Sequence, residues 1–117
     1  MVQYLNTGTE TVAKAFSALS DPVRMAIVDR LGEGAASISE LAEPVEMSLT
    51  GMKKHIRILE EARLVVTEKR GRTRVCELRS EGFDEAAFWL DEFRRKRHQQ
   101  LNRLEDLIEQ RKKETYQ

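Results

Sequence analysis

The sequence predicts a mainly α-helical domain that carries one small β-hairpin. Three observations lead to this fold class. Apolar residues recur at helical spacing up to about residue 62, the period changes to two over residues 64–79, and no glycine or proline occurs from residue 84 to residue 113. At 117 residues and 13.5 kDa the chain has the length of one domain. We therefore expect four helices, a hairpin and a long final helix within a single domain over residues 1–117.

The chain begins with a polar segment, residues 1–10, and two helices are expected after it. Ser20, Asp21 and Pro22 separate these helices, because serine and aspartate are good N-caps and proline suits the first helical turn. Apolar residues recur every three or four positions in both helices. They are Val12, Phe16 and Leu19 in the first helix, and Val23, Ile27 and Leu31 in the second.

Two further helices with a brief connection form a helix-turn-helix pattern over residues 38–62. The S-x-x-E pattern that starts at Ser37 is typical of a capping box and predicts a short helix over about residues 38–43. Ser48 is the expected N-cap of the next helix, which ends near Ala62.

The second helix of this pair has an apolar face and a polar face. Its polar face carries three cations and a hydroxyl group, and Gly51 beside them allows close approach of the backbone to a ligand. Such a helix can enter the major groove of DNA, with its first residues at base edges and its cations at phosphates. The alternative is a solvated helix face. The residues expected in the core are Leu49, Met52, Ile56 and Leu59, and the polar ones are Thr50, Lys53, Lys54 and Arg57.

Residues 64–79 are expected to form a basic hairpin, with Gly71 in its turn. Cations beside a short polar tip can neutralise phosphates and release counterions, which gives affinity for DNA without sequence information. The alternative is a solvated basic turn. A helix-turn-helix followed directly by such a hairpin is the layout of a winged helix-turn-helix, which is more specific than either part. The cations of the hairpin are Lys69, Arg70, Arg72 and Arg74.

Charge is distributed unevenly along this chain, which has 20 Lys and Arg, 20 Asp and Glu, and a net charge of zero. Residues 48–79 hold nine basic and four acidic residues, whereas residues 1–47 hold three and seven. Residues 80–117 hold eight basic and nine acidic residues. A local positive field attracts phosphates whatever the total charge. Zero net charge therefore does not exclude a nucleic-acid partner.

The last helix is expected to span about residues 84–113 and to mediate dimerisation. At 1.5 Å per residue it would be roughly 45 Å long, which exceeds a compact domain of about 30 Å. A second copy related by a two-fold axis is the expected cover for its apolar residues. The alternative is a helix that folds back on its own core. The residues expected at the interface are Leu90, Phe93, Leu101, Leu104 and Ile108.

We expect no catalytic site, no metal, no cofactor and no contact with a membrane. Apolar runs are too short to cross a bilayer and the start of the chain shows no secretory signal, so the cytoplasm is the expected location. His55, Cys76 and His98 belong to three different elements and do not form a ligand cluster. Neither histidine has a plausible serine or cysteine partner for nucleophilic catalysis. Cys76 is expected to be a packed, inert thiol, with a redox switch as the alternative.

Several segments resemble the ArsR/SmtB-type winged-helix transcriptional repressors. The resemblance covers roughly residues 12–110, and it is to the metal-free members of the family, not to the arsenic or zinc sensors. The cysteines that a thiolate metal site of the family would need around residues 41–46 are absent. The matching segments are residues 16–28, 39–42, 47–48, 54–65 and 69–72, and the strand around Cys76.

The resemblance implies a homodimer that binds double-stranded DNA at an inverted-repeat operator and represses transcription by occluding a promoter. It also implies that the first and last helices form the interface, which adds Val12 and Phe16. Lys53 stands where the family commonly has a small residue, and Ala62 where it often has glycine. The groove-reading positions implied are Ser48, Thr50, Gly51, Lys53, Lys54 and His55, with Arg57 close by. For His55, the alternative is a histidine that is hydrogen-bonded locally at the edge of the packed face.

Two other functions remain open at this point. One is a sensor on the same fold that responds to a ligand or to redox conditions, and the other is a protein-interaction module that does not bind DNA. A bound ligand that changes DNA affinity would favour the sensor. A protein partner without duplex binding would favour the interaction module. The sequence indicates neither an effector nor the operator.

Overall fold

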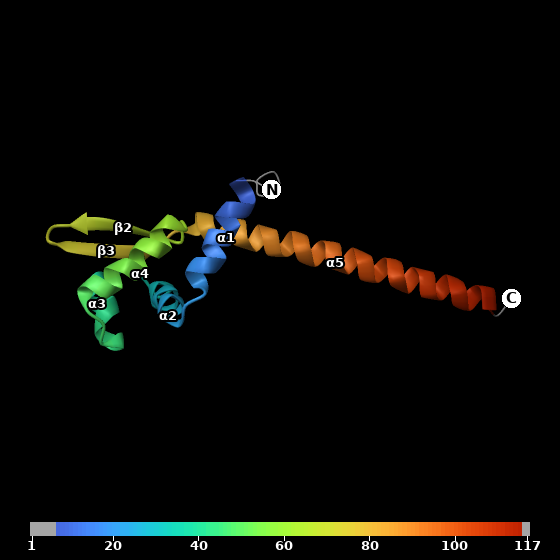
Figure 1. Ribbon diagram of the computed structural model, residues 1–117, viewed down its shortest axis with the longest axis horizontal. Helices are drawn as coiled ribbons and strands as arrows, with labels where there is room; N and C mark the ends of the chain where they lie inside the picture. The colour runs from blue at the N-terminus through green and yellow to red at the C-terminus, as the bar shows by residue number, and fades with distance from the viewer. Residues whose placement is uncertain (1–6, 116–117) are drawn as a thin grey trace. The chain divides into compact units, whose positions relative to one another are not determined.

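The computed structural model describes residues 7–115 (Figure 1). The mainly helical fold with one hairpin is confirmed. The chain divides after Ala86 into two units, which we describe separately. In chain order the elements are α1 (Thr7–Leu19), α2 (Pro22–Leu31), β1 (Ala36–Ser37), α3 (Ile38–Ala42), the 3-10 helix η2 (Glu43–Val45), α4 (Leu49–Glu61), β2 (Val65–Arg70), β3 (Thr73–Leu78) and α5 (Ser80–Thr115).

The boundary between α1 and α2 lies where the sequence predicts it. The Asp21 carboxylate accepts hydrogen bonds from the backbone N–H groups of Val23 at 2.8 Å and Arg24 at 3.2 Å. The hydrogen bond from Arg24 is the main reason why the pKa of Asp21 lies below its ordinary value. The start of α1 differs from expectation, because the helix begins at Thr7, within the segment expected to be a polar extension. Residues 1–6 of that segment lie outside the described residues.

Local hydrogen bonds define both helices of the helix-turn-helix. The Ser37 hydroxyl accepts from the Glu40 backbone N–H at 3.1 Å, and the Glu40 carboxylate accepts from the Ser37 backbone N–H at 3.2 Å. This is the predicted capping box. Ser48 accepts from the Gly51 N–H at 3.1 Å and caps α4, also as predicted. Between the two helices, Glu46 takes a left-handed conformation with φ of 52° after the short helix η2.

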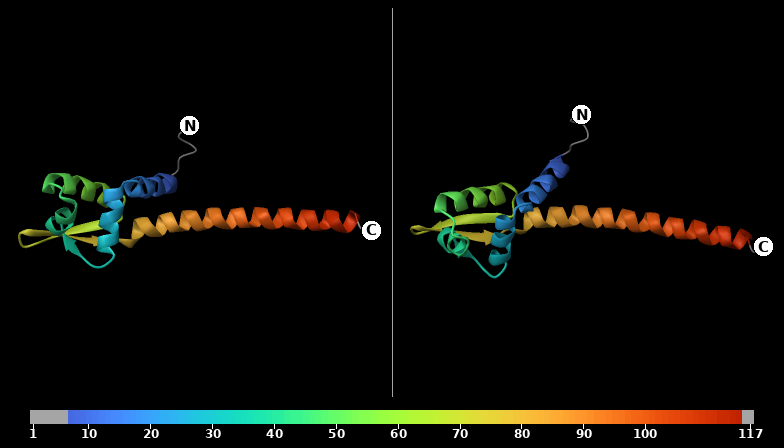
Figure 2. Two further views of the ribbon diagram at one scale, coloured as in Figure 1. Left: turned by 90° about the horizontal axis from the view of Figure 1, so that it is seen from below. Right: turned by 60° about the horizontal axis from the view of Figure 1, so that its bottom comes forward.

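The hairpin belongs to a three-stranded antiparallel sheet with the order β1-β3-β2. In the hairpin, Thr67 is the cross-strand partner of Cys76, and Lys69 is the partner of Arg74. Strand β1 was not predicted, because two residues are too few to show the alternation that marks a strand. It pairs with β3 and places the start of α3 beside the hairpin. Figure 2 shows α4 lying alongside the hairpin, in agreement with the contacts between α4 and β2.

The core of the first unit is apolar and includes most of the residues expected there. Met52, Leu59 and Leu64 have no exposed surface, and Ile56 is 2% exposed. Leu49 was expected among them, but this prediction is wrong, because Leu49 is 48% exposed. It is the first residue of α4, so the helix continues on one side of it only.

The residues that α1 buries in the core differ from the apolar residues that its sequence pattern predicts. Ala15 and Ala18 are its most deeply buried residues, at 0% and 1% exposure. Val12 is buried at 9% exposure, whereas Phe16 is 39% exposed. Small side chains therefore bring α1 close to the rest of the core, and the ring of Phe16 lies at the surface.

The first turn of α5 packs against the end of α4 within the first unit. Arg63 takes the left-handed conformation, with φ of 62°, that often falls on glycine after a helix. Its carbonyl accepts from the Gly82 N–H at 2.9 Å, and its guanidinium bonds to Glu85 at 2.9 Å. A Cβ atom at Gly82 would overlap the carbonyl oxygens of Ala62 and Arg63. Glycine is therefore required here inside a helix, and α5 starts before the predicted residue 84.

The second unit contains the remainder of α5. Over residues 87–114 its side chains are exposed, apart from the partly exposed Glu92. The rings of Trp89 and Phe93 stack with centroids 5.9 Å apart and planes at 8°. Within residues 7–115, no helix has the length and apolar character needed to cross a membrane. The exposed large apolar residues of this unit are Phe88, Trp89, Leu90, Phe93, Leu101, Leu104, Leu107 and Ile108.

Candidate nucleic-acid interface

The exposed side of α4 carries most of the residues predicted to contact base edges. Burial of Met52, Ile56 and Leu59 fixes the opposite side of the helix in the core. Gly51 is partly buried, and a Cβ atom there would lie 3.1 Å from the Met47 Cγ atom. Close packing within the chain is thus one reason for this glycine, beside the predicted approach of a ligand. The exposed residues are Ser48, Thr50, Lys53, Lys54 and Arg57.

His55 makes a hydrogen bond to another side chain of the same chain, which agrees with the alternative to a DNA contact. The Arg24 Nη1 atom lies 3.2 Å from the His55 Nδ1 atom. Since a guanidinium can only donate, Nδ1 accepts and the ring proton of a neutral His55 lies on Nε2. Arg24 also donates from Nε to the Ala18 carbonyl at 2.6 Å, so one side chain joins α1, α2 and α4. No pattern in the sequence indicates this role for Arg24, and a DNA contact through His55 Nε2 stays a prediction.

Lys69 and Arg74 lie on the face of the hairpin that packs on α4. They are cross-strand partners, so their side chains share one face of the sheet. Thr67, two residues before Lys69, shares this face, and its hydroxyl donates to the Glu60 carboxylate in α4 at 3.1 Å. Within residues 7–115, neither Lys69 nor Arg74 forms a side-chain hydrogen bond or an ion pair. Their positive charges therefore stay available for a ligand.

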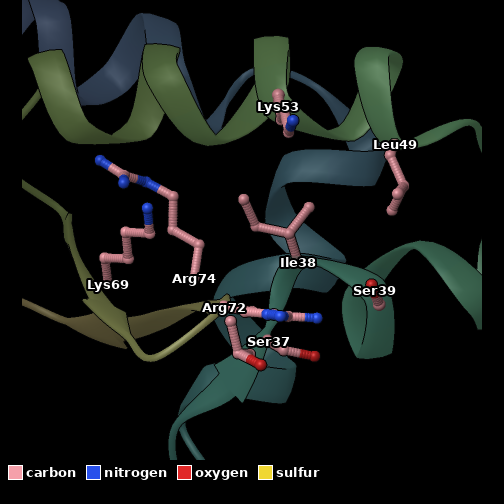
Figure 3. A pocket seen from close by; sticks show the side chains of 9 residues that line it. Ser37, Ile38, Ser39, Leu49, Lys53, Lys69, Arg72 and Arg74 are labelled. Atoms are coloured by element: carbon pink, nitrogen blue, oxygen red, sulfur yellow. The ribbon is translucent and has the colours of Figure 1, made fainter.

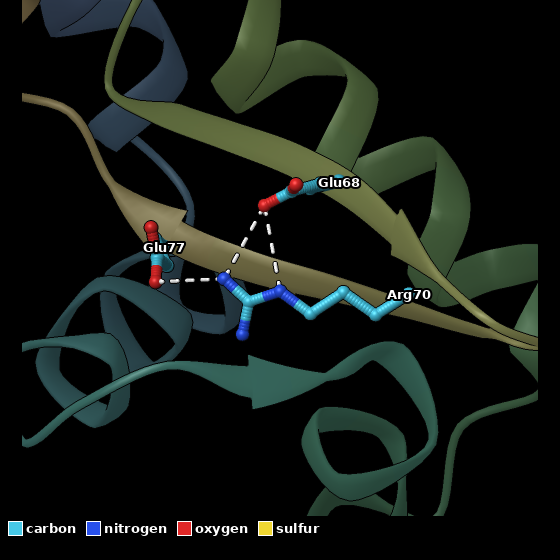
Figure 4. Close-up of polar contacts among 3 residues, drawn as sticks. All are labelled: Glu68, Arg70 and Glu77. Carbon is cyan, nitrogen blue, oxygen red and sulfur yellow. Dashed lines mark hydrogen bonds and ion pairs between the residues drawn. The ribbon is translucent and has the colours of Figure 1, made fainter.

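Arg70 lies on the opposite face of the hairpin, between two carboxylates (Figure 4). Its Nη2 atom is 3.3 Å from the Glu68 Oε2 atom and 3.5 Å from the Glu77 Oε1 atom. These carboxylates balance the charge of Arg70 within the hairpin itself. The structure therefore separates Arg70 from the other hairpin cations that were predicted to contact DNA.

A hollow of about 350 Å³ lies between α3, α4 and the hairpin (Figure 3). Lys53 reaches it from α4, and the side chains of Lys69 and Arg74 extend towards α4 from the hairpin. The sequence could not show that α3 contributes, because this depends on how β1 pairs with β3. We call this site the basic hollow, and its lining residues are Ser37, Ile38, Ser39, Leu49, Lys53, Lys69, Arg72, Thr73 and Arg74.

The residues considered for metal or redox chemistry are His55, Cys76 and His98. In the described part of the chain, no three His, Cys, Asp or Glu residues are grouped so that they could hold a metal ion. Cys76 is fully buried in β3, as expected. Desolvation raises the pKa of its thiol to about 11, so the thiol is protonated at neutral pH. Because the thiolate is the reactive form, this site does not favour redox chemistry.

The residues predicted for a dimer interface occur in both units. In the first unit, Phe16 offers exposed apolar surface, whereas Val12 is buried within the chain. In the second unit, all five predicted residues are exposed, and their pairing with a second copy stays a prediction. Their exposed fractions are 42% for Leu90, 56% for Phe93, 46% for Leu101, 54% for Leu104 and 47% for Ile108.

Comparison with known proteins shows what this chain is similar to. A family model described as a helix-turn-helix domain matches residues 19–68. The chain is 36% identical over 80 residues to the HTH-type transcriptional regulator Rv2034 of Mycobacterium tuberculosis, a match that covers 68% of this chain and 75% of that protein. It is 27% identical over 78 residues to the transcriptional repressor SdpR of Bacillus subtilis, covering 67% and 87%. A crystal structure of an ArsR family transcriptional regulator is 41% identical with a TM-score of 0.69, covering 74% of this chain and 89% of that one.

Proposed function

The chain belongs to the ArsR family of winged helix-turn-helix transcriptional regulators, and we propose that it is a repressor that binds an inverted-repeat operator as a homodimer. In this proposal, α4 enters the major groove and the hairpin contacts the adjacent phosphate backbone. The proposed repressor carries out no catalysis, holds no metal or cofactor, and acts in the cytoplasm.

The observation that supports this proposal best is a set of unpaired cations on and beside α4. In the same unit, Arg63 and Arg79 differ from these cations, because they form ion pairs with carboxylates at 2.9 and 2.8 Å. A cation without an internal partner loses no ion pair when it binds a phosphate, and it gains from counterion release. The cations without a side-chain partner among residues 7–115 include Lys53, Lys54, Arg57, Lys69, Arg72 and Arg74.

Base readout is assigned to the exposed side of α4. Ser48 and Thr50 stand in its first turn, which is the part of a recognition helix that meets base edges. Lys54 and Arg57 follow on the exposed side, and they can donate to the acceptor atoms of guanine in the major groove. Because the buried side of α4 is fixed in the core, these side chains are presented by a rigid element.

Dimerisation is assigned to the apolar residues of α5, together with Phe16. Exposed apolar residues that repeat along one helix mark an interaction surface, and a second copy is the commonest partner for such a surface. A two-fold dimer would carry two copies of α4 and would match an inverted repeat in DNA.

Selection of bound fragments from random duplex DNA, combined with a mass measurement in solution, tests the proposal. We expect one enriched inverted repeat and the mass of a dimer. The double variant Lys54→Gln and Arg57→Gln is measured in parallel. It should keep the mass of a dimer and should no longer enrich the motif. A monomer that enriches no motif would contradict the proposal.

A further inference from the structure

The basic hollow has the features of a site for a phosphate group carried on a sugar, and we propose that it binds one. Its cations come from two separate elements and meet across one space of about 350 Å³ (Figure 3). Lys53 projects from α4, while Lys69, Arg72 and Arg74 belong to the hairpin. A group bound there would contact α4 and the hairpin at the same time.

The charges of this site have no internal counterpart among the described residues. In the same hairpin, Arg70 is held by Glu68 and Glu77, yet no carboxylate lines the basic hollow. Like charges that are brought together without a counterion raise the local potential, and an anion that binds among them relieves the repulsion. The hollow therefore favours a group with at least one full negative charge.

The uncharged lining indicates what is attached to that anion. The hydroxyl group of Ser39 can donate to a phosphate oxygen beside the cations. Ile38 and the half-exposed Leu49 supply an apolar wall, which suits the carbon skeleton of a sugar. A volume of about 350 Å³ is within the range of about 300–1,000 Å³ for small-molecule sites, so it holds more than a bare phosphate ion.

This chemistry has two sources, namely the backbone of duplex DNA and a free nucleotide. The DNA source rests on the proposed function, because α4 brings a duplex backbone beside the hollow only if it reads a groove. A free nucleotide needs no such assumption. Since both would occupy the same cations, a bound nucleotide is expected to compete with DNA.

Titration of the DNA-free protein with deoxythymidine bisphosphate, at constant ionic strength and followed by calorimetry, tests the site itself. We expect saturable binding that weakens about tenfold or more in Lys53→Gln and in Arg74→Gln, because each removes a charged hydrogen bond. The matched control is Arg70→Gln, which removes the same charge from the other face of the hairpin and is expected to bind within about twofold of the unchanged protein. Absence of binding, or an equal decrease in all three variants, would overturn the proposal.

A second measurement identifies the source of the phosphate. Duplexes with a single uncharged methylphosphonate are compared for binding to the unchanged protein and to Lys53→Gln. A DNA phosphate occupies the hollow if a methylphosphonate at one position weakens binding to the unchanged protein but does not weaken binding to Lys53→Gln. Absence of any such position, with nucleotide binding intact, identifies a free nucleotide as the ligand. If the protein selects an operator yet binds no bisphosphate, this inference fails while the proposed repressor function stands.

Discussion

Both faces of the β2–β3 hairpin carry cations, but only one face also carries the carboxylates that pair with them. On one face, Lys69 and Arg74 extend towards α4 without an internal partner among the described residues. On the other face, Arg70 lies between Glu68 and Glu77. A count of cations in the sequence treats these faces alike. In the structure, the positive charge that is not balanced by a carboxylate lies mainly on the face of Lys69 and Arg74.

Strand register explains this difference. Side chains alternate between the faces of a strand, so Glu68 and Arg70 share one face, and Lys69 lies on the other. In β3, Arg74 pairs with Lys69, while Glu77 lies on the face of Arg70. Shifting the register by one residue would place a carboxylate in the basic hollow. The availability of a cation for DNA therefore depends on its register as much as on its position near the turn.

The largest effect on DNA binding is expected when the unpaired face is neutralised. Lys69→Gln combined with Arg74→Gln should weaken binding to every duplex, by about 1.5–3 kcal/mol for each charged hydrogen bond to a phosphate that is removed. The salt dependence should become less steep by about 0.9 for each phosphate that is no longer neutralised. Fluorescence anisotropy with an operator and a random duplex, at several salt concentrations, measures both quantities. Unchanged affinity would remove the distinction between the two faces.

A smaller but more selective effect is expected from α4. Lys54→Ala should weaken operator binding by about 1–3 kcal/mol if its ammonium group reaches a base, and random duplexes should be affected much less. The same result is expected for Arg57→Ala. The ratio of the two dissociation constants, measured in one titration series, gives the outcome. Equal decreases in affinity for both duplexes would assign these side chains to phosphates, as for the hairpin.

Arg72 at the hairpin turn is expected to contribute less than the pair on the unpaired face. Arg72→Ala should cost about 1 kcal/mol on all duplexes alike, since it removes a single exposed hydrogen bond to a phosphate. The check is the slope of affinity against salt for the variant and the unchanged protein. Equal slopes would count against a backbone contact at this position.

The smallest effect is expected on the paired face. Arg70→Gln should change duplex affinity by less than about 0.5 kcal/mol, because its charge is already balanced and the residue is exposed. The anisotropy assay used for Arg72→Ala measures it under the same conditions. If Arg70→Gln and Arg72→Ala weaken DNA binding equally, Arg70 breaks its ion pairs with Glu68 and Glu77 to contact DNA. The two faces of the hairpin then do not differ in the way proposed.

Local features could be predicted from the sequence because neighbouring residues determine them. The caps at Asp21, Ser37 and Ser48 each depend on hydrogen bonds to residues two or three positions away. The hairpin follows from alternation around Gly71. The polar face of α4 could be predicted from the helical period, because Met52 and Ile56 are apolar and turn one side of the helix towards the core.

Features that depend on contacts between distant segments could not be predicted in this way. The hydrogen bond between Arg24 and His55 joins residues 31 positions apart. The basic hollow needs the pairing of β1 with β3, and β1 is too short to recognise. Leu49 matches the apolar face on a helical wheel, but a wheel does not show whether the first turn is covered. Gly82 precedes the predicted start of the last helix, whereas in the structure it lies inside α5 and lets this helix contact the carbonyl groups of Ala62 and Arg63 closely.

The burial of Cys76 makes spectroscopic labelling of this protein simple. The chain has one cysteine, and its thiol has a pKa raised from the ordinary 9.0 to about 11. Thiol reagents attack thiolates, so the native cysteine stays unlabelled in the folded protein near neutral pH. A cysteine introduced at an exposed position therefore becomes the only labelling site, without removal of the native one. A spin label or a fluorophore could then report distances between two copies of the chain on DNA, in a protein whose core is unchanged.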